Sequence, residues 1–251
     1  MKGKRGSMTL VINHLTGGYT KIPVIKDINF SIQPGSICGL VGLNGAGKST
    51  TIKHIVGLLQ GFEGEIAIND IKLAKQQADY RRSLAFIPET PVLYEELTFR
   101  EHIELTAKAY GQDTKETYDC AYTLVEQFRL TNKLDFYPAY FSKGMKQKVL
   151  IVCALMLKVP VYIIDEPFLG LDPLGIRTLL NCINEKRNQG ASILMSTHVL
   201  DTAERFCDEF IILHEGKVLE QGTLAELLAK TGEKRLEEAY FSLLDQGEHN
   251  G

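Results

Sequence analysis

The sequence of 251 residues contains no tryptophan, and its five cysteines are scattered without a C-x-x-C pair. Disulfide frameworks and zinc sites need paired or closely spaced cysteines, so this pattern indicates reduced thiols in a cytoplasmic protein. Long apolar runs are also missing. The longest, "VLIVCALML" (149–157), is well short of the roughly 20 residues that span a bilayer. The basic start "MKGKRGS" has no apolar core after it, so we expect no signal peptide.

Neither sign of charge dominates the chain. It has 28 Lys and Arg against 31 Asp and Glu, a net charge of −3. No whole-chain basic field favours nucleic acid, so we expect no nucleic-acid partner. An apolar fraction of 44% and a charged fraction of 24% are ordinary for a globular domain. The length allows one large domain or a core with an inserted subdomain.

Short apolar segments alternate with helical ones along most of the chain, which predicts an α/β fold with a mainly parallel sheet. Residues 23–32 alternate apolar and polar side chains, as in an antiparallel strand with one exposed face. Residues 34–42 combine a turn with an apolar run, typical of a strand buried on both faces. We expect further strands at 9–13, 64–70, 83–88, 161–165 and 191–197 and as a pair within 210–222, and helices at 49–59, near 173–189 and after His198.

Residues of about 89–158 have a different, helical character. Three helix starts are predicted there, the first two with capping-box spacing: Thr98 with Glu101, Asp113 with Glu116, and Ser142. We therefore expect one domain, in which a helical subdomain of residues 89–158 is inserted into a core of residues 8–88 and 159–230. The tail, residues 231–251, is acidic and helical and would cap the domain or bind a partner.

The stretch "GLNGAGKST" (42–50) matches G-x-x-x-x-G-K-[ST] between a predicted buried strand and a predicted helix. Its glycines allow a tight loop whose backbone N–H groups bind phosphate oxygens. Lys48 would reach the β- and γ-phosphates, and Ser49 would offer its hydroxyl to Mg²⁺. The alternative, a Gly-rich turn with a chance lysine, is disfavoured by the flanking elements. The loop residues predicted to bind nucleotide are Gly42, Asn44, Gly45, Gly47, Lys48, Ser49 and Thr50.

The stretch "VYIIDEP" (161–167) ends a second buried strand with two carboxylates. Ligands of parallel sheets bind at this end of the strands. Asp165 would hold Mg²⁺, and Glu166 would polarise the attacking water as a general base. The alternative is an acidic pair that caps a helix before the turn at Pro167.

The stretch "FSKGMKQKV" (141–149) begins a helix with a glycine in its first turn, which usually costs helix stability. Ser142 would cap this helix, and the free N–H groups of the first turn could bind an anion. Gly144 lacks a Cβ, so a phosphate could come close. Taken alone, the segment also fits an ordinary capped helix with a solvated basic face. Helical spacing predicts four residues in the core: Met145, Val149, Val152 and Met156.

These motifs, in this order and with "GLDP" at 170–173, resemble those of the ATP-binding subunits of ABC transporters. The resemblance covers residues of about 8–230. It implies a P-loop NTPase (RecA-like) α/β core with an antiparallel β part and an inserted α-helical subdomain. It also implies an ATPase that uses ATP and Mg²⁺. The sequences of these motifs are most similar to those of exporter-type subunits, particularly the bacterial Ecs type.

The resemblance assigns "FSKGM" to the signature, which reads LSGGQ in the family and contacts ATP held by the other subunit of a head-to-tail dimer. Its contact residues would be Ser142, Lys143, Gly144 and Met145. Lys143 replaces the first signature glycine and Met145 replaces the glutamine. Contacts made by backbone N–H groups do not depend on either side chain, so the role of the helix is unaffected. Whether the dimer contains two copies of this chain or one copy and a relative stays open.

Four other positions acquire roles from the resemblance. Tyr19 would stack on the adenine ring, or else is a strand-edge tyrosine. Glu89 stands in the Q-loop, where the family usually has Gln, and would offer an oxygen to Mg²⁺ or to water. Asp172 belongs to the D-loop and is expected at the dimer interface. His198 follows a predicted strand as the switch histidine near the γ-phosphate.

The partners implied are a second ATPase subunit, as a homodimer, and a transmembrane permease subunit. The chain would sit at the cytoplasmic face of the cell membrane and contact it only through the permease. Residues 90–103 are the candidate surface for the permease, with three apolar contacts or core residues: Tyr94, Leu97 and Phe99.

Three other classes of protein fit the sequence less well. A soluble ABC ATPase of translation or DNA repair usually has two ATPase units or a coiled-coil arm, and this chain has one P-loop and no such arm. A P-loop kinase or GTPase would need a lid or an N-K-x-D motif and would leave "FSKGM" and "GLDP" unexplained. A non-enzymatic nucleotide-gated module is disfavoured because both Glu166 and His198 are present.

Overall fold

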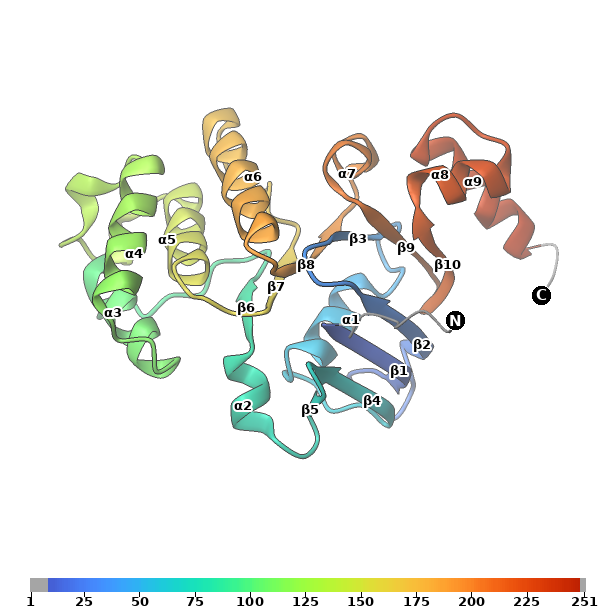
Figure 1. Cartoon of the computed structure of the whole chain (residues 1–251), viewed down its shortest axis with the longest axis horizontal. Coiled ribbons are helices and arrows are strands. Elements are labelled where there is room, and N and C mark those ends of the chain that lie inside the picture. The colour runs from blue at the N-terminus through green and yellow to red at the C-terminus, as the bar shows by residue number, and fades with distance from the viewer. Residues whose placement is uncertain (1–8, 249–251) are drawn as a thin grey trace, which may run out of the picture.

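Two β-sheets and the helices around them form the part of the chain that the computed structural model describes, residues 9–248 (Figure 1). The basic N-terminal stretch, residues 1–7, lies outside the described residues. The larger sheet has the order β10-β9-β3-β8-β7-β6. Its strands are β3 (Ile37–Val41), β6 (Leu84–Ile87), β7 (Val161–Asp165), β8 (Ser192–Thr197), β9 (Glu209–His214) and β10 (Lys217–Thr223).

The larger sheet is parallel from β6 to β9, and only β10 runs antiparallel to its neighbour. The prediction of a mainly parallel sheet is therefore confirmed. The smaller sheet, of order β2-β1-β4-β5, is antiparallel, as predicted for residues 23–32. Its strands are β1 (Leu10–Gly17), β2 (Ile25–Ile32), β4 (Glu63–Ile68) and β5 (Ile71–Lys72).

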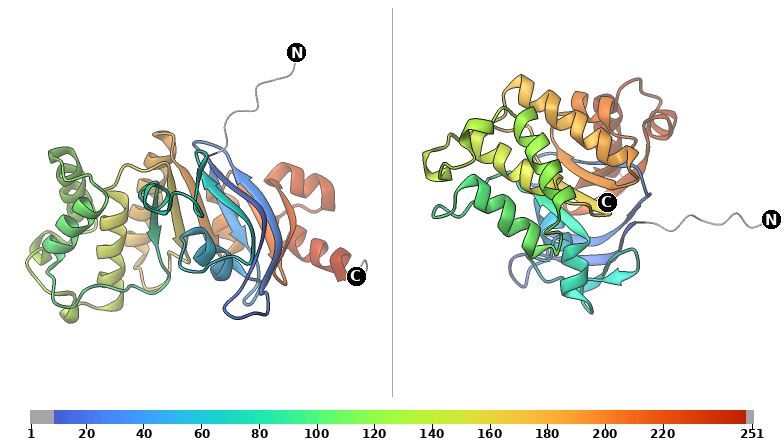
Figure 2. Two further views of the ribbon diagram at one scale, coloured as in Figure 1. Left: turned by 90° about the horizontal axis from the view of Figure 1, so that it is seen from below. Right: turned by 60° about the vertical axis from the view of Figure 1, so that its left-hand side comes forward.

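The helices cover both faces of the larger sheet and both ends of the molecule (Figures 1 and 2). They are α1 (Lys48–Ile55), α2 (Gln77–Arg82), α3 (Phe99–Ala109), α4 (Lys115–Gln127), α5 (Lys143–Leu155), α6 (Pro173–Asn188), α7 (Leu200–Phe206), α8 (Leu224–Thr231) and α9 (Leu236–Glu248). In the left view of Figure 2, α3–α5 form one end and the C-terminal helices the other. Within residues 9–248, no helix combines the length and the apolar character that crossing a membrane requires.

Three apolar clusters hold these layers together. One lies between the two sheets and includes Ile52 and Ile55 of α1. A second joins α3–α6 to the opposite face of the larger sheet. Val149, Val152 and Met156 are buried in it and Met145 packs against it, as predicted from helical spacing. The third cluster joins α7–α9 to β3 and β9.

The helix starts of the 89–158 region are confirmed at two of three places. Thr98 and Glu101 form the predicted capping box. The prediction for Asp113 and Glu116 is wrong, because Thr114 caps α4 and its hydroxyl accepts from the N–H of Thr117 at 3.3 Å. The Asp113 carboxylate instead accepts a hydrogen bond from the hydroxyl of Tyr118 at 2.5 Å. The Asp113 carboxylate is thus bound to a nearby side-chain donor and not to the N–H groups at the start of α4.

The strand order brings the ends of three strands together. In the register of the sheet, Val41 at the end of β3 lies opposite Thr197 of β8. Asp165 at the end of β7 lies opposite Ser196 of the same strand β8. The segments that follow β3, β7 and β8 therefore leave the sheet side by side, and they carry the candidate site.

Candidate active site

The loop between β3 and α1 is shaped by its glycines. Gly47, at φ 106°, precedes the first residue of α1, in the left-handed region that favours glycine. A Cβ at Gly42 would lie 2.5 Å from the carbonyl oxygen of Leu213. Among the described residues, no side chain caps α1. The N–H groups of its first turn therefore remain available for an anion.

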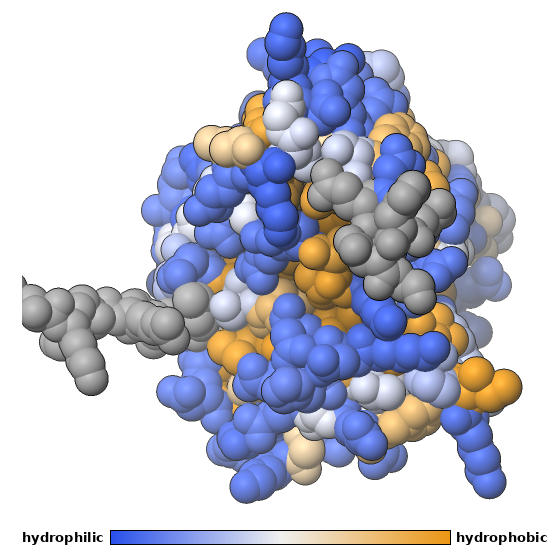
Figure 3. Space-filling view, turned by 90° about the vertical axis from the view of Figure 1, so that its right-hand side faces the viewer, coloured by the Kyte–Doolittle hydropathy of each residue, from blue (hydrophilic) through white to orange (hydrophobic). Residues whose placement is uncertain are grey.

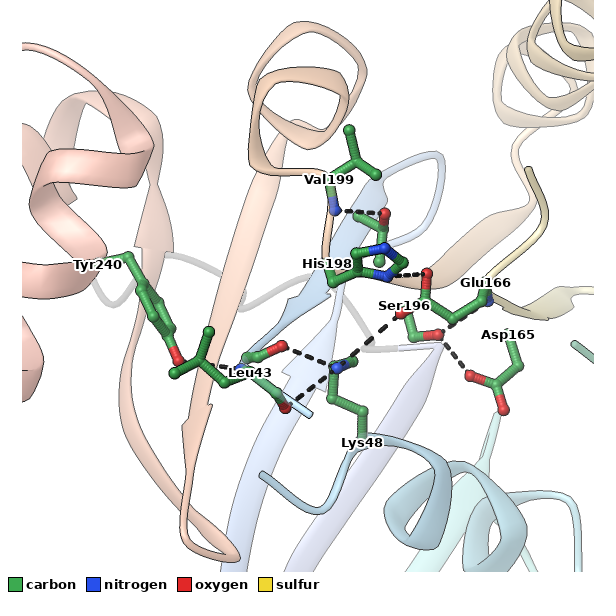
Figure 4. A network of polar contacts seen from close by, with 10 residues as sticks. Leu43, Lys48, Asp165, Glu166, Ser196, His198, Val199 and Tyr240 are labelled. Atoms are coloured by element: carbon green, nitrogen blue, oxygen red, sulfur yellow. Dashed lines mark hydrogen bonds and ion pairs between the residues drawn. The ribbon is translucent and has the colours of Figure 1, made fainter. Parts of the chain in front are cut away.

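Lys48 is a buried ammonium held by oxygen atoms. Its Nζ donates to the carbonyl oxygen of Gly42 at 2.7 Å and to that of Leu43 at 3.3 Å, and it lies 3.9 Å from Oε1 of Glu166 (Figure 4). Only 7% of the residue is exposed. The positive charge is thus fixed between the phosphate loop and the acidic end of β7, where phosphate charge could be balanced.

Asp165 lies at the end of β7 with little exposure. Its Oδ1 accepts a hydrogen bond from the hydroxyl of Ser196 at 2.5 Å. Burial raises the pKa of the Asp165 carboxyl, hydrogen bonds from Ser196 and Ser49 oppose this, and the charges of Glu89 and Glu166 add to it. Burial therefore disfavours the ionised form of Asp165, and a cation beside the carboxylate would stabilise that form.

Glu166 is positioned by backbone and side-chain contacts together. Its φ of 45° is unusual for a residue with a side chain. Its N–H donates to the hydroxyl of Ser196 at 3.0 Å. One carboxylate oxygen, Oε2, lies 2.9 Å from Nδ1 of His198, while Oε1 faces Lys48 (Figure 4). The carboxylate is held on two sides, by a group that can donate a proton and by a fixed cation.

A cavity of about 410 Å³ opens above the phosphate loop, and it gathers residues from four predicted motifs. Its lining comprises Val24, Leu43, Asn44, Gly45, Gly47, Lys48, Ser49, Thr50, Glu89, Glu166, Leu169 and His198. The structure therefore brings the phosphate loop and the side chains of Glu89, Glu166 and His198 to one place. Gly42 contributes its carbonyl to Lys48, and Asp165 interacts with Ser49 behind the loop.

Tyr19 lies at the margin of this cavity, on the turn after β1. Its hydroxyl accepts hydrogen bonds from Lys53 at 3.1 Å and from Thr50 at 3.5 Å. The bond from Thr50 is the main cause that lowers the pKa of Tyr19. More than half of the residue, 56%, is exposed. An exposed ring anchored at the cavity edge is suited to stack on a flat ligand.

The signature candidates do not join this cavity. Among the described residues that line it, none comes from Ser142–Met145, and Asp172 is absent as well. Ser142 caps α5 as predicted, with its hydroxyl accepting from the N–H of Met145 at 3.3 Å. A Cβ at Gly144 would lie 2.3 Å from the carbonyl oxygen of Gly170. This close approach within the chain explains the first-turn glycine without any ligand.

Asp172 caps α6 and pairs with α5. Its carboxylate accepts from the N–H of Gly175 and from Nζ of Lys148, both at 2.7 Å. The bond from Lys148 is the main cause that lowers the pKa of Asp172. The "GLDP" segment is thus tied to α5, the helix that begins at the candidate signature.

The oxygen donors of the site fit Mg²⁺. Within residues 9–248, no group of three or more His, Cys, Asp or Glu side chains is arranged to hold a metal ion. Mg²⁺ seldom needs such a cage, because it keeps waters and uses one or two carboxylates together with substrate phosphates. The Ser49 hydroxyl and the carboxylates of Asp165 and Glu89 supply this kind of partial donor set.

The candidate permease surface needs one correction. Phe99 is fully buried and belongs to the core of the helical region, because it begins α3 and faces inward. It cannot contact a partner directly. Tyr94 is 63% exposed and Val92 is 79% exposed. The exposed apolar side chains of this segment therefore precede α3.

Two residues of the site were not predicted from the sequence. Ser196 joins Asp165 to the backbone of Glu166, and Tyr240 binds the phosphate loop through the N–H of Leu43 at 3.0 Å. The sequence offered a weak signal for Ser196, since β8 ends with two polar residues, Ser196 and Thr197, after an apolar run. No local signal pointed to Tyr240, because it lies 197 positions from Leu43.

Comparison with known proteins agrees with this geometry. The family model described as ABC transporter matches residues 25–169. The chain is 54% identical to the ABC-type transporter ATP-binding protein EcsA of Bacillus subtilis (strain 168) over 237 residues, covering 93% of this chain and 96% of that protein. It is 33% identical to the SkfA peptide export ATP-binding protein SkfE of the same organism, covering 83% of this chain and 87% of that one.

A solved structure of an ATP-binding subunit of an ABC transporter superposes with a TM-score of 0.91. It is 52% identical and covers 94% of this chain and 99% of its own. The P-loop NTPase fold predicted from the motifs is therefore confirmed.

Proposed function

Because the chain belongs to the ABC transporter ATP-binding family, whose members hydrolyse ATP, we propose that it powers export through a separate membrane subunit as a head-to-tail dimer. One observation supports the proposal of a dimer. The cavity above the phosphate loop and the segment Ser142–Met145 lie apart in one chain, since none of these four residues lines the cavity. A second copy, turned head to tail, would bring the signature of one chain over the cavity of the other.

Hydrolysis in this proposal uses the groups that surround the cavity. Glu166 accepts a proton from the attacking water, and His198 orients its carboxylate through Oε2. Lys48 already lies between the loop and Glu166, so it needs little reorganisation to balance charge that develops on the γ-phosphate. Tyr19 stacks on the adenine ring at the cavity edge. Ser49, Asp165 and Glu89 would hold Mg²⁺, and the ion would neutralise charge on the phosphate oxygens.

The partner contacts follow from the second surface. Ser142, Lys143, Gly144 and Met145 at the start of α5 meet the γ-phosphate of the other copy through backbone N–H groups. Asp172, tied to the same helix by Lys148, lies at the dimer interface.

Export through a membrane subunit rests on the relatives and on the exposed segment before α3. The name of SkfE, a relative at 33% identity, states peptide export. Val92 and Tyr94 present apolar side chains beside the cavity residue Glu89, where a permease could sense the nucleotide. The chain would thus work at the cytoplasmic face of the membrane, bound through the permease.

Light scattering of Glu166→Gln tests the dimer. Slow turnover traps bound ATP, so addition of Mg-ATP should double the mass of the monomer. Glu166→Gln combined with Lys48→Ala is the matched control and should stay monomeric, because it loses the phosphate contact. A Glu166→Gln monomer that binds ATP and does not associate at high protein concentration would refute the homodimer.

A further inference from the structure

The C-terminal helix α9 packs beneath the phosphate loop. Its residues Leu236, Tyr240 and Leu243 are buried in the third apolar cluster. The same cluster contains Val41, the last residue of β3 before the phosphate loop. Figure 3 views this end of the molecule, where hydrophilic side chains surround apolar ones. The tail therefore caps the domain, one of the two alternatives that the sequence left open.

A hydrogen bond extends from α9 to the phosphate loop. The hydroxyl oxygen of Tyr240 accepts from the N–H of Leu43 at 3.0 Å (Figure 4). Leu43 lines the ATP cavity, and its carbonyl oxygen accepts from Nζ of Lys48 at 3.3 Å. One peptide segment of the loop is therefore held by the tail on its N–H side and by the catalytic lysine on its carbonyl side.

Tyr240 is suited to act as a fixed, neutral hydrogen-bond acceptor. Only 1% of Tyr240 is exposed, and its burial raises the pKa of the phenol above its ordinary value. The hydroxyl thus stays protonated at neutral pH. A phenol with its ring packed in a core has few rotamers, so its oxygen holds Leu43 at little entropic cost.

A second connection links α9 to the other side of the site. Arg235, just before α9, forms an ion pair with Asp201 of α7, and the N–H of Leu236 donates to Oε2 of Glu204 at 2.8 Å. Helix α7 begins two residues after His198. The start of α9 is therefore anchored to the element that follows the switch histidine.

We propose that Tyr240 is a positioning residue for ATP, which holds the entrance of the phosphate loop in its binding shape from the C-terminal helix. The proposal rests on the proposed role of the loop in ATP binding. It predicts that the tail sets nucleotide affinity without touching the nucleotide.

Tyr240→Phe is the sharpest test, because it keeps the ring in the cluster and removes only the acceptor. We expect the Kd and KM for ATP to rise about two- to tenfold, the range that one net hydrogen bond provides. The kcat should change less than twofold, since Glu166 and His198 keep their contacts. Tyr110→Phe is the matched control. It also loses a hydroxyl bond, which is partly buried and which Tyr110 donates to the carbonyl of Leu84 at 2.9 Å, and it should leave ATP affinity unchanged.

Amide hydrogen exchange shows whether the effect passes through Leu43. Its amide should be protected in the wild type and should exchange faster in Tyr240→Phe. Unchanged ATP affinity in a folded Tyr240→Phe protein, or a rapidly exchanging Leu43 amide in the wild type, would overturn the proposal. The wild-type measurement decides the matter even if the variant folds poorly. Failure of the ATP site itself would appear separately, as undiminished ATP binding in Lys48→Ala.

Discussion

The substitution Glu166→Gln tests the assignment of the general base. It keeps the size of the side chain and removes its negative charge and its basicity. In the structure the carboxylate contacts Nδ1 of His198 at 2.9 Å and faces Nζ of Lys48 at 3.9 Å. A positioned base contributes about 10²–10⁴-fold, which equals about 3–5 kcal/mol of transition-state stabilisation. We therefore expect kcat to fall by at least about 100-fold.

ATP affinity should remain within about threefold of the wild type, because the charge removed lies beside the anionic γ-phosphate and does not attract it. Single-turnover phosphate release and binding of a fluorescent ATP analogue separate these two effects. Glu65→Gln is the control, since Glu65 forms a partly exposed ion pair with Lys72 away from the cavity. Retained turnover in Glu166→Gln would remove Glu166 from the base role, and equal losses of binding and turnover would assign it a structural one.

Two further predictions concern stability. Asp165→Asn should raise the Tm at neutral pH while abolishing hydrolysis, because burial raises the pKa of this carboxyl and its ionised form is destabilising. The gain should shrink as the pH falls through the raised pKa, where the wild-type carboxyl becomes protonated; a gain independent of pH would contradict this. Gly144→Ala should lower the free energy of unfolding by about 1–3 kcal/mol, since its Cβ meets the backbone of Gly170. The Cβ of Gly175→Ala would meet side-chain atoms and no backbone, with the end of Lys148 at 3.1 Å and Oδ1 of Asp172 at 3.4 Å. This variant should cost less in the same denaturant titration, and an equal cost would refute the clash.

Contiguous motifs allowed much of the site to be predicted from the sequence. Residues 42–50 carry a recognisable local pattern, because the glycines, the lysine and the helix start lie within nine consecutive residues. The same holds for the capping box at Thr98, whose partners lie three residues apart. Asp113 shows the limit of this reasoning. Asp113 and Glu116 have capping-box spacing, but the helix is capped by Thr114, and the Asp113 carboxylate accepts from the hydroxyl of Tyr118.

Contacts between distant segments required the tertiary structure. From the sequence, the apolar Phe99 could face a partner or the core. The packing of α3 places it in the core. Gly144 suggested space for a phosphate, and the structure gives the glycine a second reason, because a Cβ there would lie 2.3 Å from the carbonyl oxygen of Gly170.

The sequence by itself determined the family, the phosphate loop and the carboxylates, since each depends on neighbours in the chain. The tertiary structure decided what holds them. Ser196 reaches Asp165 only through the register of β7 and β8, and Tyr240 reaches Leu43 only because α9 packs against the end of β3. Such hydrogen bonds join residues that share no local pattern, so they exist only after the sheet and the C-terminal helix have assembled.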